Sequence, residues 1–208
     1  KVAFLMDPLE KLDLKGDTSF ALALEAQERG HTIHHFTPDA LILKSNKVLA
    51  NICKFELVTE NEFNNYKYYE KNIQLLSDFD IVLMRQDPPF DMSYITATHL
   101  LEKLPKKTIV VNNPFEVRNA PEKIFVTNFP HLMPETLITK DINVIKSFRD
   151  EFQDIVIKPL YGNGGQGVFH LKPNDENFYS ILEMFFKQSN EPLMIQKYLK
   201  DVRNGDKR

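Results

Sequence analysis

The residues between Asp154 and Leu171 carry the clearest chemical pattern in this 208-residue chain. An apolar run over 155–157 ends in Lys158 and a proline, and four of the chain's seven glycines then fall within 162–167. Because glycine tolerates positive φ and lets backbone N–H groups approach a ligand closely, such a loop can cradle phosphate groups. A lysine at its mouth would supply a point charge for the same oxygens.

The same stretch is also consistent with a long, glycine-rich hairpin turn that leaves Lys158 in solvent. It does not fit the two familiar phosphate-binding loops. No G-x-x-x-x-G-K-[ST] is present, and the loop runs into the strand-like segment 168–171 instead of opening a helix. A glycine loop that joins two strands and lies over a nucleotide is the functional interpretation that remains beside the hairpin.

Several polar residues follow directly after segments that read as buried strands, namely Asp7, Arg85, Asp87 and Asn112. Ligands gather at the carboxyl ends of the strands in parallel α/β sheets. Arg85 enters a turn stiffened by Pro88 and Pro89, and a guanidinium of restricted freedom is suited to bidentate capture of a carboxylate. The alternative is a surface arginine that pairs with Asp87 or Asp91.

Two other segments are weaker candidates. Asp17 and Ser19 precede a predicted helix, so they are expected to cap it, and they could also lend its N-terminus to an anionic ligand. The segment 196–199 follows the last predicted strand. Its extended backbone could pair with the edge of an adenine, or it could be an ordinary crossover between domains.

Histidine and cysteine chemistry is not favoured. The six histidines form no H-x-x-x-H or H-E-x-x-H pattern, and His34 and His35 in one strand point to opposite faces. The single cysteine, Cys53, excludes an internal disulfide and is expected to be a buried apolar side chain in a reducing, cytoplasmic compartment. We therefore expect structural or surface roles for these residues.

Composition limits the function classes. Apolar residues make up 42% and charged residues 26% of the chain, as in ordinary globular proteins. A net charge of −3 argues against a general nucleic-acid binder. No apolar run approaches the roughly 20 residues of a membrane-spanning helix, so no membrane partner is expected.

Apolar runs and helix breakers predict an α/β layer with a mostly parallel sheet over residues 1–120. We expect strands at 2–6, 31–36, 79–84 and 108–111, helices at 17–30 and 93–104, a hairpin over 40–49 that 51–58 extends, and a helix or loop at 60–76.

Residues 121–208 predict an α+β unit that contains an antiparallel strand pair. The expected helices are 121–129, 141–152 and 175–187, and the expected strands are 135–139, 154–158, 168–171 and 193–196.

Taken together, the motifs resemble bacterial-type glutathione synthetase, a member of the ATP-grasp superfamily. Each is weak alone, but their order along the whole chain is specific: Met6–Pro8, Asp17–Phe20, Arg85–Asp91, Pro121–Lys123, Pro134–Thr136, Ile157–Leu160 with Gly162–Gly165, Gln196–Leu199 and Gly205–Arg208. The resemblance implies an N-terminal substrate domain over 1–120, followed by the lid part of an ATP-grasp domain over 121–208.

The activity implied by the resemblance is ATP-dependent ligation of γ-glutamylcysteine and glycine through an acyl phosphate. Lys123, Lys158 and the loop residues Gly162, Asn163, Gly164 and Gly165 then match the phosphate-binding groups. Gln196, Lys197, Tyr198 and Leu199 match the segment that faces adenine, and Asp206 matches a nucleotide contact. Arg208 matches an arginine near the reacting groups, and Arg85, Asp17 and Ser19 match the peptide-binding side.

The family's Mg²⁺ (or Mn²⁺) ligands are expected beyond Arg208, so the segment alone is expected to bind ATP weakly and to be inactive. Similar proteins are commonly homotetramers. Two alternatives stay open. One is another ATP-grasp carboxylate–amine ligase, against which the motif at 85–91 argues, and the other is a non-catalytic nucleotide-binding module.

Overall fold

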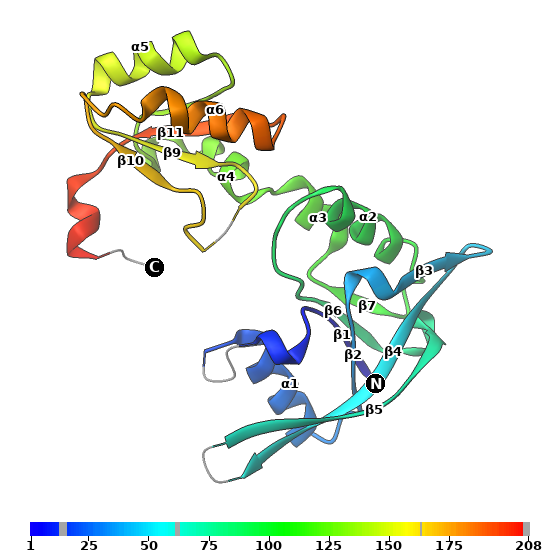
Figure 1. The fold of residues 1–208 in the computed structure, drawn as a ribbon. Coiled ribbons are helices and arrows are strands. Elements are labelled where there is room, and N and C mark those ends of the chain that lie inside the picture. Colours follow the sequence, from blue (N-terminus) through cyan, green and yellow to red (C-terminus); the bar gives the residue numbers. More distant parts are fainter. Residues whose placement is uncertain (13–15, 61–62, 163, 206–208) are drawn as a thin grey trace. The chain divides into compact units, whose positions relative to one another are not determined.

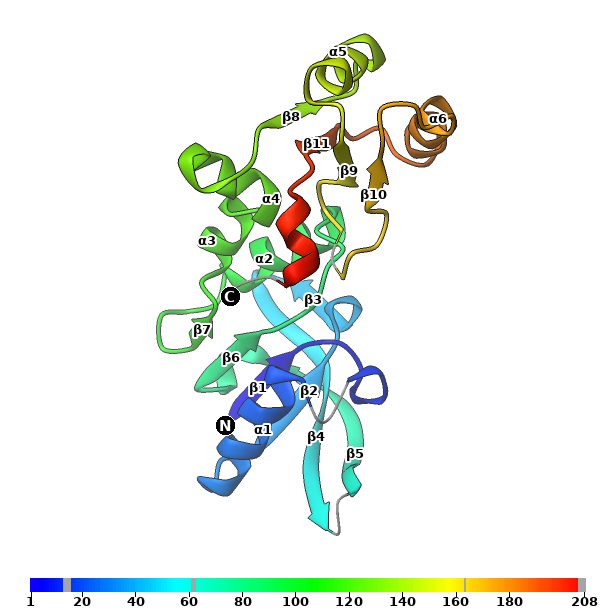
Figure 2. The same ribbon diagram turned by 90° about the vertical axis from the view of Figure 1, so that its left-hand side faces the viewer.

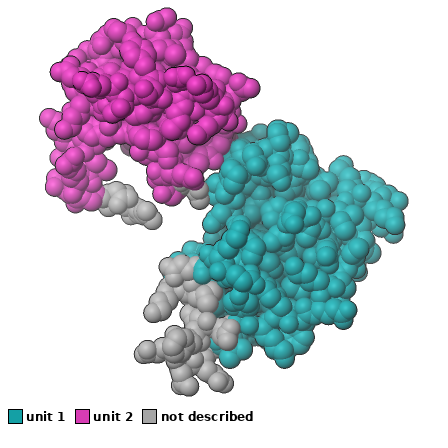
Figure 3. Space-filling model, viewed as in Figure 1, with its two compact units in different colours: residues 1–119 teal, residues 120–208 magenta. Residues whose placement is uncertain are grey.

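A computed structural model describes residues 1–12, 16–60, 63–162 and 164–205. The chain divides into two compact units, Lys1–Asn119 and Ala120–Arg208, which Figure 3 shows in different colours. Each unit has its own sheet and its own apolar core.

The first unit is built on a seven-stranded mixed sheet with the order β3-β4-β2-β1-β6-β7, in which β5 pairs with β4 (Figure 1). Four short strands are parallel: β1 (Val2–Leu5), β2 (Ile33–Phe36), β6 (Ile81–Met84) and β7 (Ile109–Val111). Three are antiparallel: β3 (Leu41–Lys44), β4 (Lys47–Glu60) and β5 (Phe63–Leu75). The parallel strands thus occupy one side of the sheet and a long hairpin the other.

Helices bury both faces of this sheet. α1 (Thr18–Glu28) packs Phe20 and Ala23 into a core with Phe4 and Phe55. On the other face, α2 (Met92–Leu101) packs against residues of β1, β4 and β6, and α3 (Pro114–Asn119) contributes Val117 beside them (Figure 2). β1 and β6, in the middle of the parallel strands, are continuously apolar in sequence, whereas the edge strand β7 is partly exposed.

The prediction of helix or loop over 60–76 was wrong, because most of this segment is β5. Its register runs from Phe63 opposite Glu60 to Leu75 opposite Leu49, with an irregularity opposite Cys53. The side chains of this polar, tyrosine-rich segment alternate between the two faces of the strand. Tyr66 and Tyr68 pack against the core, and Tyr69 points outward. A strand with one solvated face has too few apolar residues to be recognised by hydrophobicity alone.

The second unit has a four-stranded antiparallel sheet with the order β10-β9-β11-β8. Its strands are β8 (Thr136–Thr139), β9 (Ile155–Pro159), β10 (Phe169–Leu171) and β11 (Leu193–Lys197). α5 (Ile142–Phe152) and α6 (Phe178–Gln188) cover one face through a core that includes Ile145, Ile157 and Leu182. The strand, glycine loop and strand predicted from the sequence is confirmed as the β9–β10 pair.

The helix expected over 121–129 is shorter than predicted. α4 covers Glu122–Phe125, and 3-10 turns follow at Val126–Asn128 and Pro130–Leu132. Pro130 has no backbone N–H and disfavours the helical conformation of Phe129, so no α-helix can run on through this residue. Within the described ranges, no helix is long and apolar enough to cross a membrane.

Leu182→Ala should lower the free energy of unfolding of the second unit by about 2–5 kcal/mol, because it empties a fully buried position between α6 and the sheet. Met184→Ala on the same helix is the matched control, since that side chain is 38% exposed. Urea unfolding of both variants measures the difference, and equal losses would contradict this assignment of the core.

Candidate functional site

In the first unit, Arg85 lies where the parallel strands end. It directly follows β6, and its backbone N–H donates to the carbonyl of Leu5 at the end of β1 (2.7 Å). Its Nε donates to the Ser19 hydroxyl (3.2 Å). Among the described residues, no carboxylate lies within ion-pair distance of Arg85, so the predicted alternative of a pair with Asp87 or Asp91 is not formed. The terminal guanidinium nitrogens therefore remain free to bind an external anion.

Asp17 and Ser19 support this arginine from the start of α1. Asp17 is the N-cap, and its Oδ1 accepts from the backbone N–H groups of Ser19 (2.6 Å) and Phe20 (3.1 Å). Ser19 is only 4% exposed and presents its hydroxyl to Arg85. The cap predicted from the sequence is confirmed, and the hydroxyl fixes the orientation of the guanidinium.

Acidic residues surround the same strand ends. The Asp7 carboxylate accepts from the backbone N–H of Asp87 (3.0 Å) and so holds the turn that follows Arg85. Burial, with the nearby charges of Asp7 and Asp17, raises the pKa of Asp87, and Arg85 opposes the rise. Asp91 caps α2 through the N–H of Tyr94 (2.9 Å). Cation and carboxylates together form a polar site suited to a zwitterionic head group.

In the second unit, Lys158 lies on the sheet face opposite α5 and α6. Its neighbours along β9, Ile155 and Ile157, face the helical core, so the alternation of the strand directs Lys158 away from it. Gln196 is on the same face as Lys158, and its amide donates to the Thr136 hydroxyl (2.8 Å). Burial, and then the charge of Lys123, lower the pKa of Lys158.

Lys123 on α4 holds the entrance of the glycine loop. Its ammonium donates to the carbonyl of Leu160 (3.3 Å) and, in a shorter contact, to the carbonyl of Gly162. Among the described residues, neither Lys123 nor Lys158 has a carboxylate within ion-pair distance. Two ammonium groups without a carboxylate partner therefore lie beside the loop.

The glycines of the loop meet a conformational requirement. Gly164, Gly165 and Gly167 have φ of 59°, 74° and 69°, a region that side chains disfavour. A Cβ on Gly167 would also lie 3.2 Å from the Pro159 ring. The glycines are thus needed for the path of the chain, whether or not a ligand is bound.

The segment Gln196–Leu199 is tied to both of its neighbours. The N–H of Lys197 donates to the carbonyl of Glu135 (3.0 Å), and that of Tyr198 to the carbonyl of Asp154 (2.9 Å). The Tyr198 ring stacks on His170, with ring centroids 3.8 Å apart. Sequence reasoning assigned no site role to His170, although its place on a strand after the glycine loop was the available signal.

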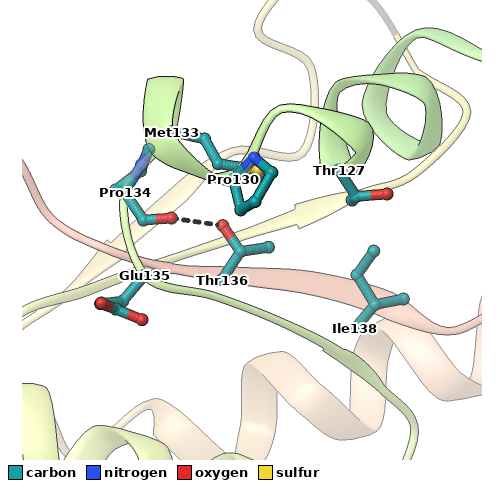
Figure 4. A pocket seen from close by; sticks show the side chains of 7 residues that line it. All are labelled: Thr127, Pro130, Met133, Pro134, Glu135, Thr136 and Ile138. Carbon is teal, nitrogen blue, oxygen red and sulfur yellow. Dashed lines mark hydrogen bonds between the residues drawn. The ribbon is translucent and has the colours of Figure 1, made fainter.

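A pocket of about 410 Å³ opens beside β8 on the same unit (Figure 4). The strand contributes Thr136 and Ile138, and the Thr136 hydroxyl donates to the carbonyl of Pro134 (2.7 Å). The remaining lining residues are Thr127, Pro130, Met133, Pro134 and Glu135. Its size is that of a small-molecule site, and it is adjacent in the sheet to Gln196.

The predicted site residues therefore fall into two groups, one in each unit. Lys123, Lys158 and Gln196 gather in the second unit, and Arg85 with its capping partners lies in the first. Asn163, Asp206 and Arg208 were also predicted to belong to the site, but they lie outside the described residues.

Cys53, His34 and His35 are buried in the first unit. Cys53 is fully buried, and burial raises the pKa of its thiol, which disfavours the nucleophilic thiolate. His34 packs edge-on against Phe79 on one face of the sheet, and His35 packs edge-on against Phe55 on the other face. The two neighbouring histidines therefore point to opposite faces, as predicted.

Magnesium requires oxygen ligands, and carboxylates are its usual protein donors. Within the described ranges, no three histidine, cysteine, aspartate or glutamate side chains are grouped so as to hold a metal ion. The acidic residues around Arg85 form no such group, so the described residues do not fit a metal ion.

Solved structures with the same architecture belong to ATP-grasp proteins. A RimK domain ATP-grasp protein from Sphaerobacter thermophilus superposes with a TM-score of 0.59 at 18% identity, over 96% of this chain and 64% of that one. The D-cycloserine synthetase DcsG gives a TM-score of 0.59 at 14% identity, over 97% and 61% of the two chains. At these identities the likeness establishes the ATP-grasp fold.

Sequence comparison narrows the class to one family. Residues 1–118 match the N-terminal domain of prokaryotic glutathione synthetase, and residues 122–208 match its ATP-grasp domain. The chain belongs to the prokaryotic glutathione synthetase family. It is 56% identical over its whole length to the glutathione synthetases of Mesorhizobium japonicum and Brucella melitensis, and it spans 66% of the length of each.

Nucleotide binding should be coupled to protonation of Lys158. Because the pKa of Lys158 is lowered, its ammonium loses a proton at a lower pH than an exposed lysine does. The negative charge of a bound polyphosphate would raise this pKa again, so the amine would take up a proton on binding. ATP binding by the full-length protein should therefore take up protons at alkaline pH and weaken as pH rises. Calorimetry in two buffers of different ionisation enthalpy measures the uptake.

Lys158→Met should abolish this proton uptake. Lys146→Met is the matched control, because Lys146 is an exposed lysine of the same unit that pairs with Asp150 (2.7 Å). Uptake that persists in Lys158→Met would contradict the assignment.

Proposed function

We propose that the protein containing this chain is a glutathione synthetase. It joins the cysteinyl carboxylate of γ-glutamylcysteine to the amino group of glycine and converts ATP to ADP and phosphate. The observation that carries the proposal is the pair of ammonium groups, Lys123 and Lys158, placed beside a glycine loop without a carboxylate partner among the described residues. The family match of both units supports the same reaction.

The chemistry proceeds through an acyl phosphate. A carboxylate oxygen of the dipeptide attacks the γ-phosphorus of ATP, and the bond to the β-phosphate oxygen breaks to release ADP. The glycine amine then attacks the acyl carbon, loses a proton, and expels phosphate. Neither step needs a protein nucleophile, so the protein's task is to neutralise phosphate charge, align the reactants and exclude water.

The second unit takes the nucleotide. Lys158 supplies positive charge on the sheet face opposite α5 and α6, and Lys123 does so at the mouth of the glycine loop. The N–H groups of that loop can turn toward phosphate oxygens. Gln196–Leu199 provides the extended backbone for the adenine edge, with the β8 pocket next to it. Asn163, Asp206 and Arg208 are assigned to the same site by the family resemblance.

The first unit takes the dipeptide. Arg85 binds a substrate carboxylate with the guanidinium nitrogens that Ser19 leaves free. Asp17 orders the start of α1, and the carboxylates of Asp7 and Asp87 face the cationic part of the same head group. A zwitterionic γ-glutamyl group offers both kinds of charge, which matches this arrangement.

The same family resemblance extends the proposal to the working enzyme. It uses Mg²⁺ or Mn²⁺ held by residues beyond Arg208, acts in the cytoplasm, and assembles as a homo-oligomer. No nucleic acid or membrane takes part in its function.

Phosphate release by the full-length protein with ATP and Mg²⁺ tests the reaction. Release should require both γ-glutamylcysteine and glycine, and glutathione should form in equal amount. Release with a different amine acceptor would instead identify another carboxylate–amine ligase. Nucleotide binding without release for any substrate pair would indicate a non-catalytic module.

Arg85→Lys should raise the KM for γ-glutamylcysteine by about 10- to 100-fold, because an ammonium cannot reproduce two parallel hydrogen bonds to a carboxylate. The KM for ATP should stay unchanged. Arg118→Lys is the matched control, since Arg118 is an arginine of the same unit that bonds to Glu102 (2.9 Å) and Thr98. Equal effects of the two substitutions would contradict a substrate role for Arg85.

A further inference from the structure

A buried histidine in the first unit contacts the loop that supports Arg85. His35 on β2 is 3% exposed. Its Nε2 lies 3.3 Å from the carbonyl oxygen of Met6 and 3.2 Å from that of Asp7, just after β1. Its Nδ1 lies 3.4 Å from the hydroxyl of Tyr68 on β5, and that hydroxyl accepts from the backbone N–H of Leu9 (3.3 Å).

The partners fix the position of each proton. Carbonyl oxygens only accept, so Nε2 must carry the imidazole proton. Nδ1 is then an acceptor, and the Tyr68 hydroxyl donates a hydrogen bond to it. The oxygen of the same hydroxyl accepts a hydrogen bond from the backbone N–H of Leu9. Tyr68 on β5 and His35 on β2 are thus hydrogen-bonded to each other and form a bridge to the segment 6–9. Tyr68 binds this segment at Leu9, and His35 binds it at Met6 and Asp7.

This bridge requires an uncharged imidazole, and the surroundings of His35 favour one. Burial is the largest cause that lowers the pKa of His35, and Lys71 adds to it, while Glu10 and the two carbonyl contacts oppose it. His35 is therefore neutral at neutral pH, and Nδ1 keeps its lone pair for Tyr68.

The bridged segment carries the carboxylate that holds the arginine turn. Asp7 is fixed at its carbonyl by His35, and its side chain accepts the N–H of Asp87, two residues beyond Arg85. Movement of this backbone would displace the carboxylate, free the Asp87 amide and loosen the turn. His35 meets the polar site at the backbone carbonyl of Asp7 and not at Arg85, so its effect on Arg85 must pass through Asp7.

We propose that His35 and Tyr68 are positioning residues that hold the segment 6–9, and through Asp7 the turn that presents Arg85 to the dipeptide. The substrate half of this inference rests on the proposed function. The positional half, from Tyr68 to the amide of Asp87, does not depend on which substrate is bound.

Kinetics of the full-length protein test the substrate half. Tyr68→Phe and His35→Leu should each raise the KM for γ-glutamylcysteine by about three- to tenfold, and leave the KM for ATP and glycine unchanged. His35→Gln should restore much of the loss, because its amide can donate to the same carbonyls. His34→Gln is the matched control, since His34 is a neighbouring histidine, 6% exposed, on the opposite face of the same strand.

Hydrogen exchange at the Asp87 amide tests the positional half. Pro88 and Pro89 have no N–H, so a short peptide over this turn reports almost only on Gln86 and Asp87. Exchange at Asp87 should be about tenfold faster in Tyr68→Phe and His35→Leu than in the wild type or His34→Gln, while the amides of β6 keep their protection.

Each outcome decides the inference. Unchanged exchange at Asp87, or equal changes in KM for His34→Gln, would overturn it, because the role of His35 would then be packing alone. A wild type without ligase activity would refute the proposed function, and the exchange data would still decide whether His35 and Tyr68 hold the turn.

Discussion

The proposed nucleotide site depends on two ammonium groups that are partly buried and held close together. Lys158 is partly buried and lies close enough to Lys123 for that charge to lower its pKa. Lys123 is held in place by carbonyls of the glycine loop, so it cannot retreat into solvent without releasing the loop. Placing two cations together in this way is unfavourable in the free protein. In the proposed function, a bound polyphosphate would offset this cost.

In both units, the residues of the apolar core and the polar residues of the candidate site occupy different parts of the sheet. In the second unit, α5 and α6 bury one face of the sheet and leave the other to Lys158 and Gln196. In the first, both faces are buried, so the polar groups gather where the parallel strands end. Arg85 is placed there by a backbone bond to β1 and a hydroxyl from α1. The sequence around each site can therefore be polar without weakening either core.

Much of this could be read from the sequence, because short apolar strands and clustered glycines leave strong local signals. The β9–β10 pair and the polar strand ends were both predicted for this reason. The long strand β5 was not, since its tyrosines and charges alternate on a half-solvated ribbon and its pairing partner is distant in the chain. Nor could the bridge from Tyr68 through His35 to Asp7 be predicted, because it joins three strands whose register is set only by the folded sheet.

The transfer of oxygen from the dipeptide to phosphate tests directly whether the reaction passes through an acyl phosphate. The full-length protein would be given ATP, glycine and γ-glutamylcysteine labelled with ¹⁸O in the cysteinyl carboxylate, and the released phosphate analysed by mass spectrometry. An acyl phosphate requires that one labelled oxygen appear in the phosphate and the other remain in the new peptide bond. Phosphate without label, formed alongside turnover, would mean that water or another group attacks ATP, and would contradict the account.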